Sequence, residues 1–180
     1  DRARSVGSGI LRLTLGTIMA SKGAIFLYNN SENKLSFLST KGVEEEEPIA
    51  PSKALLNSFK KYRHGHALLA GDEKWITGRF KKHSRKLKTK VVLPLYHQEN
   101  LLGLLCIGEK FMGETYTKID LKILEIIANH LTKALYNYQL IDDVEEKKTE
   151  LNLKLLELET LFDISVAISS VLDVDELGEE

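Results

Sequence analysis

The feature that most constrains this fold is a continuous helical pattern from Ile119 to about Leu172. Residues 119–135 have the broad apolar face of a helix that packs on a core. From Ile141 onward the apolar positions narrow to a stripe with alternating three- and four-residue spacing, as at the a and d positions of roughly four heptads. We call this stripe the seam; it contains Ile141, Val144, Lys148, Leu151, Leu155, Leu158, Phe162, Ser165, Ser169 and Leu172.

A stripe this narrow predicts a partner helix, because a lone surface helix would leave its leucines in water. We therefore expect a parallel homodimer that passes a signal along the helix, as in a sensory or relay module. Lys148 is the one charged residue of the seam. It is expected to weaken the coiled coil locally and to keep it switchable.

Net charge and cysteine content narrow the functional classes. The formal net charge is -1, which argues against generic electrostatic binding to nucleic acid or to an anionic membrane. Cys106 is the only cysteine, so no disulfide can form within the chain, which fits a reducing cytoplasm. The sequence has no run of about 18 apolar residues and predicts no transmembrane helix. It lacks an initial Met and stops within a repeating pattern, so we expect a piece of a longer protein.

The residues before the long helix alternate between helical and strand patterns. Ile10 to Met19 form an apolar helical face, and Gly23 is expected to end this helix. Thr117 and Asp120 have the spacing of a capping box at the start of the long helix. The predicted helices cover residues 1–21, 53–63 and 119–172, the predicted strands residues 24–28, 35–40, 66–70, 90–96 and 101–107, and the predicted loops or irregular connectors residues 44–51 and 71–89.

This order of elements predicts an α+β fold. Two hairpins between helices favour a central antiparallel sheet with helices on both faces, followed by a long C-terminal signalling helix. We expect the first and last helices over one face, and the middle helix and the connector over the other. Gly103 lies inside a predicted strand, which suggests a bulge or a close backbone approach.

The predicted domain boundaries follow the change of pattern along the chain. Residues 1–140 form the sensory domain, and residues 141–158 form a coiled-coil linker helix. The apolar spacing of Leu161–Ile168 resembles that of Leu11–Ile18. Residues 159–180 therefore either begin a second copy of the domain or continue the coiled coil.

Several short segments, taken in this order, resemble the GAF domain family. They are Gly23–Tyr28, Val91–Leu95, Leu102–Ile107 and Phe111–Asp120. The resemblance covers about residues 5–140. It implies a GAF- or PAS-like α+β fold and a cytoplasmic sensory module, of the kind found in bacterial regulators, that binds a small molecule or dimerises. An effector such as a PPM-type serine phosphatase, a diguanylate cyclase or a histidine kinase would lie outside this chain.

The sequence departs from two ligand-binding branches that it resembles. Cyclic-nucleotide-binding members carry an Asn-Lys…Phe…Asp-Glu constellation, whereas this chain has Glu109-Lys110-Phe111 and Asp120 without the full set. Bilin-binding members attach the pigment through a loop cysteine, whereas Cys106 lies inside an apolar strand. The interpretation of Cys106 is therefore a small buried apolar residue.

A ligand pocket, if the domain has one, is expected between the strand faces and the connector. The alternative is that the same aromatic side chains simply fill the core. The candidate lining residues are Phe26, Tyr28, Phe37, Ser39, Trp75, Phe80, Leu93, Leu95 and Cys106.

The strongest local charge feature is the basic connector at residues 79–90. Arg79, Lys81 and Lys82 are candidates to grip an anionic ligand. The alternative is a solvated helix or loop with Phe80 and Leu87 as its apolar anchors. Nucleic-acid binding is disfavoured, because the connector lacks a groove-reading motif and the interleaved aromatic residues of single-strand binders.

The sequence predicts no enzyme active site, metal site or required cofactor. It has no recognisable Ser/His/Asp arrangement and no phosphate-binding loop. His64 and His66 lie near a predicted helix end without a metal-ligand cluster. Three functions remain: a ligand-responsive sensory and dimerisation module, a structural dimerisation spacer without a ligand, and an anion- or nucleotide-binding module that uses the basic connector.

Overall fold

The computed structural model describes residues 2–45, 47–60, 62, 67–69 and 78–176. The chain divides into two compact units, Asp1–Asn137 and Tyr138–Glu180. A single helix, α4 (Lys118–Glu176), contributes its first part to one unit and the rest to the other. No helix within the described ranges is long and apolar enough to cross a membrane.

The first unit is built on a five-stranded sheet with the strand order β2-β1-β5-β4-β3. Every neighbouring pair is antiparallel, and the two predicted hairpins, β1–β2 and β4–β5, are both present. The strands are β1 (Gly23–Asn29), β2 (Lys34–Lys41), β3 (Leu68–Leu69), β4 (Val91–His97) and β5 (Asn100–Ile107).

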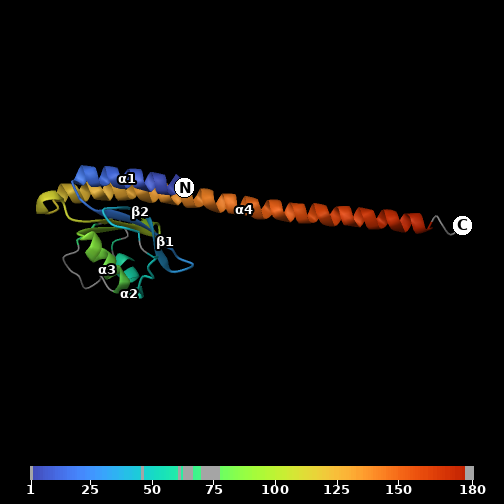
Figure 1. Ribbon diagram of the computed structural model, residues 1–180, viewed down its shortest axis with the longest axis horizontal. Coiled ribbons are helices and arrows are strands. Elements are labelled where there is room, and N and C mark those ends of the chain that lie inside the picture. Colours follow the sequence, from blue (N-terminus) through green and yellow to red (C-terminus); the bar gives the residue numbers. More distant parts are fainter. Residues whose placement is uncertain (1, 46, 61, 63–66, 70–77, 177–180) are drawn as a thin grey trace. The chain divides into compact units, whose positions relative to one another are not determined.

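Helices cover both faces of this sheet, as the sequence predicts for an α+β fold. Figure 1 shows α1 (Arg2–Ile18) and the first part of α4 over one face, with α2 (Lys53–Lys60) and α3 (Gly78–Leu87) at the other. Helical spacing brings one stripe of each covering helix into the core. The buried leucine and isoleucine residues of the first pair are Leu11, Leu15 and Ile18 of α1 and Leu124, Leu131 and Leu135 of α4.

The close approach predicted at Gly103 is confirmed. This glycine pairs with Leu27 of β1 on one side and with Leu95 of β4 on the other. A register shift between Leu95 and Tyr96 marks a bulge beside it. A Cβ atom at Gly103 would overlap the carbonyl oxygen of Phe26, so only glycine lets the strands come this close.

Two local predictions are wrong. The connector expected to be irregular contains the helix α3, which agrees with the helical alternative for residues 79–90. The first helix ends at Ile18, where Met19 adopts a φ of 57° and the Ala20 N–H donates to the Leu15 carbonyl. Gly23 therefore begins β1 and does not end α1. A side chain there would press against Leu11 and Leu15, each 3.0 Å from the Cβ position.

The predicted bounds of α2 and β3 differ from those in the structure by a few residues. Ser52 caps α2, since its Oγ accepts a hydrogen bond of 3.2 Å from the Leu55 N–H. The short strand predicted at residues 66–70 is β3, and its predicted first and last residues lie outside the described part of the chain.

Candidate functional site

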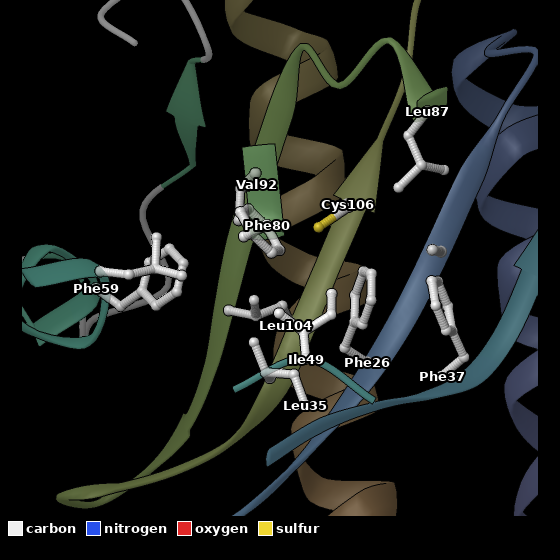
Figure 2. Packing of buried hydrophobic residues seen from close by; sticks show 12 residues of the cluster. Phe26, Leu35, Phe37, Ile49, Phe59, Phe80, Leu87, Val92, Leu104 and Cys106 are labelled. Atoms are coloured by element: carbon white, nitrogen blue, oxygen red, sulfur yellow. The ribbon is translucent and has the colours of Figure 1, made fainter. Parts of the chain in front are cut away.

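The candidate site is a cluster of aromatic rings between the sheet and the helices α2 and α3 (Figure 2). Phe26 of β1 and Phe37 of β2 have ring centroids 4.5 Å apart. Phe80 of α3 lies 6.0 Å from Phe26 and 6.4 Å from Phe59 of α2. Tilted and edge-on contacts at these distances are favourable for aromatic pairs. The ring contacts therefore hold α2 and α3 against the face of the sheet opposite α1.

Aliphatic side chains and one thiol complete the walls of this cluster. Strand alternation directs Val92 of β4 and Leu104 of β5 to the same face. Cys106 is fully buried among them, and burial raises the pKa of its thiol far above the ordinary value. A neutral buried thiol is a weak nucleophile, so Cys106 acts here as a small apolar residue.

The structure brings together only part of the predicted pocket. Phe26, Phe37, Phe80 and Cys106 belong to the cluster, and Tyr28 packs at its margin. The Tyr28 hydroxyl donates to Asn33 Oδ1 at 3.0 Å.

The remaining predicted pocket residues lie elsewhere. Leu93 and Leu95 are buried outside the cluster, on the face of β4 that alternation turns toward α4. Ser39 pairs with Ile25, and its Cβ lies 3.8 Å from the Cβ position of Gly7 in α1. A ligand at the aromatic cluster would therefore not touch these three residues. Trp75 lies outside the described residues.

The sequence interpretation missed two members of this region. Phe59 of α2 is not among the predicted pocket residues, and it is fully buried against Phe80. His83 of α3 is 6% exposed and meets the ring of Phe37 edge-on, with centroids 5.6 Å apart. The helical spacing of Phe80, His83, Ser84 and Leu87 is the signal that identifies this inner face of α3.

The basic residues of α3 lie on its outer side. Lys82, Arg85 and Lys86 are exposed, whereas Lys81 is half-buried. The side chain of Arg79 lies outside the described part of the chain. An amphipathic helix of this kind closes the cluster with one face and presents cations to solvent with the other.

A polar junction joins β5 to the start of α4. The Lys110 ammonium lies 2.9 Å from Asp120 and 3.6 Å from Glu114, and its side chain is 9% exposed. Asp120 accepts a 2.8 Å hydrogen bond from the Thr117 N–H, while its own N–H donates to Thr117 Oγ1 at 3.2 Å. The predicted capping box is thus confirmed. The Tyr116 hydroxyl donates to the Gly108 carbonyl at 2.6 Å.

The junction favours the ionised form of Asp120. Partial burial alone raises the pKa of this carboxyl group, but hydrogen bonds from Thr117 and Lys110 outweigh that effect and lower it below the ordinary value. The hydrogen bond to Asp120 in turn raises the pKa of Lys110. Both shifts indicate that the pair stabilises the folded junction as an ion pair.

We predict that Asp120→Asn destabilises the first unit by about 1 kcal/mol at neutral pH, because the cap and the charge at the helix start are weakened. A carboxyl group with a lowered folded-state pKa stabilises the fold above its unfolded-state pKa of about 3.9 and loses that contribution as the pH falls through the folded value. The difference in the free energy of unfolding between wild type and variant should therefore disappear at acidic pH. Urea unfolding across a pH series measures it, with Asp142→Asn on the exposed helix as the control. A gap that stays constant with pH would contradict the electrostatic origin.

The predicted histidine pair lies outside the described residues, because His64 and His66 are not placed. Within the described ranges, no three His, Cys, Asp or Glu side chains gather closely enough to hold a metal ion.

The second unit presents the predicted seam on an uninterrupted helix. From Ile141 to Phe162 the large apolar side chains of the seam are exposed, from 51% at Leu155 to 69% at Phe162. On the same helix Leu153, Leu156 and Ile164 are exposed outside the seam.

Comparison with known proteins identifies the fold of the first unit. The GAF domain family model matches residues 8–135. The GAF domain of a Coxiella burnetii phosphoenolpyruvate-protein phosphotransferase is 12% identical with a TM-score of 0.62, covering 78% of this chain and 86% of its own. The PixJ GAF domain of Thermosynechococcus elongatus is 12% identical with a TM-score of 0.61, covering 81% and 92%. A GAF domain/HD domain protein of Geobacter sulfurreducens is 18% identical with a TM-score of 0.60, covering 77% and 94%. No match is found among curated proteins.

Proposed function

The chain belongs to the GAF domain family, and we propose that it is a regulatory sensory module that dimerises through the seam of α4. In this proposal the aromatic cluster responds to a small molecule or to a neighbouring domain. The response changes the packing of α1 and α4 on the sheet. The helix then carries that change along the seam to an effector outside residues 1–180.

The exposed seam is the observation that carries this proposal. Leu151, Leu155, Leu158 and Phe162 are each more than half exposed, and α4 is the only element among the described residues of their unit. Burying a side chain of this size contributes about 1.5–3 kcal/mol. A second copy of the helix removes this surface from water at the spacing of a two-stranded coiled coil.

The ligand half of the proposal rests on the aromatic cluster. Its walls are apolar, so an apolar or aromatic small molecule is the class that fits. Such a ligand has to part Phe80 of α3 from Phe26 of the sheet, whose ring centroids are 6.0 Å apart. Occupancy would thus move α3 directly.

The same ring contacts favour a second candidate function. A cluster whose rings already touch resembles a filled core, as in a structural dimerisation spacer without a ligand. In that case the seam has its partner, but no small molecule changes its packing.

The similar structures support a place within a larger signalling protein. One is a GAF domain/HD domain protein. Another is a segment, residues 122 to 287, of a methyl-accepting chemotaxis protein. We propose that residues 1–140 form the sensory domain, residues 141–158 the linker helix, and residues 159–180 the start of a second domain or a continuation of the coiled coil. The boundary between the two compact units, at Asn137 and Tyr138, supports the first of these limits.

Native mass spectrometry of the chain purified freshly from cells tests the proposal. A dimer that carries an additional small mass supports the ligand-responsive module and gives the mass of the ligand. A dimer without an adduct favours the spacer. A monomer at micromolar concentration contradicts dimerisation through the seam.

We predict that Lys148→Leu stabilises the dimer. Lys148 occupies an a position, where a charged side chain reduces coiled-coil stability. Each copy of the variant adds one leucine to the seam, which contributes about 1.5–3 kcal/mol when fully buried. Thermal unfolding of the helix, followed at several protein concentrations, measures the effect. An unchanged midpoint would show that residue 148 does not lie in the interface.

A further inference from the structure

The charges beside the seam specify how a second copy would lie against it. In the heptad that places Leu155 at a and Leu158 at d, Lys154 occupies g and Glu159 occupies the next e position. In a parallel, in-register pair of helices, these two positions face each other across the interface. The symmetry of the pair makes the same contact twice.

We propose that the second copy pairs in parallel and in register, with Lys154 of each copy against Glu159 of the other. This inference rests on the proposed dimerisation, for which the seam already predicts a parallel pair, and adds the register and the residues that select register and orientation. The next g and e positions hold Leu161 and Val166, which are 57% and 52% exposed. In the same register these two side chains meet across the interface and widen its apolar centre.

Lys154 and Glu159 are available for this contact. Lys154 pairs along its own helix with Glu150 at 2.7 Å, but both side chains are about two-thirds exposed, at 65% and 64%. An exposed pair of this kind contributes little and exchanges readily for another. Among the described residues, Glu159 has no ion pair of its own.

The antiparallel register that packs Leu151 on Leu155 brings like charges together. If Leu151 of one copy packed on Leu155 of the other, with the remaining seam layers matched, g positions would face g positions and e positions would face e positions. Lys154 would then lie beside Lys154, and Glu145 beside Glu159. Like charges across an interface disfavour that arrangement.

A parallel shift by one heptad is also disfavoured. In register, the two Lys148 side chains share one layer of the seam, whose other neighbours are apolar. A shift places each Lys148 against an apolar residue and so creates two polar layers. It also moves Glu159 away from Lys154. A single polar a position is a known determinant of coiled-coil register.

Charge exchange tests the pair. Lys154→Glu and Glu159→Lys should each raise the dimer dissociation constant by roughly tenfold at low salt, because both symmetric contacts become repulsive. The double exchange restores opposite charges and should return the constant to within about twofold of wild type. Lys147→Glu is the matched control, since its partner position holds Asn152 and the constant should change little. Sedimentation equilibrium measures all of these variants; additive losses in the double variant would overturn the proposed contact.

Cysteine cross-linking tests the orientation. In a Cys106→Ala background, Val144→Cys places a thiol at a d position, which faces its own copy only in a parallel, in-register pair. Mild oxidation should give a covalent dimer, whereas Glu146→Cys on the outer side should not. A wild-type dimer in which Val144→Cys does not cross-link overturns this inference and leaves the proposed dimer standing. A wild-type monomer overturns both.

Discussion

Replacing Gly103 with alanine is expected to destabilise the sensory unit by about 3 kcal/mol or more. The new Cβ atom overlaps the carbonyl oxygen of Phe26 and lies 3.1 Å from its carbonyl carbon. Both are backbone atoms of the neighbouring strand, so no side chain can rotate to make room. β5 lies between β1 and β4, and its displacement disturbs two ladders of hydrogen bonds at once.

Thermal unfolding of the first unit measures this effect, which corresponds to a fall in Tm on the order of 10 °C. Gly9→Ala is the matched control, because a Cβ atom there meets nothing within 4 Å and α1 gains a better helix former. The control should leave stability unchanged or raise it by about 0.5–1 kcal/mol. A Gly103→Ala variant within about 1 kcal/mol of wild type would contradict the close approach of the two strands.

The elements that depend on local sequence were predictable. The β4–β5 hairpin follows from two apolar runs separated by a polar turn, and the start of α4 follows from the spacing of Thr117 and Asp120. The close approach at Gly103 was predictable because a glycine inside an apolar strand often marks a bulge or a neighbouring backbone. In each case the signal lies within a few residues of the feature that it produces.

Features that depend on tertiary packing were not predictable in the same way. α3 has a strongly polar sequence, and its helix is stabilised by the contacts of Phe80 and Leu87 with the sheet. The face of Ser39 is set by the register shift opposite Ile25 and Phe26, which moves it toward α1. A one-residue shift reverses the face of every following side chain. The predicted pocket therefore mixed residues from both sides of the sheet.

The seam itself is expected to be the most sensitive part of the second unit. Leu155→Asp replaces a central a residue in both copies and places two carboxylates where the dimer would bury leucines. Burying an unpaired charge costs several kcal/mol per ion, and the burial of two leucines is lost as well. We therefore expect the variant to be monomeric at concentrations where the wild type is dimeric.

Leu156→Asp distinguishes the seam from the rest of the helix. Leu156 is the next residue, and in the single chain it is exposed to a similar degree, at 60% against 51% for Leu155. The two substitutions change helix propensity and net charge equally, so only a partner on the seam side separates their effects. Sedimentation equilibrium should show a monomer for Leu155→Asp and a dimer for Leu156→Asp. Equal effects of the two changes would mean that the apolar side chains of α4 do not form a heptad interface. The helix would then not carry its signal as a two-stranded coiled coil.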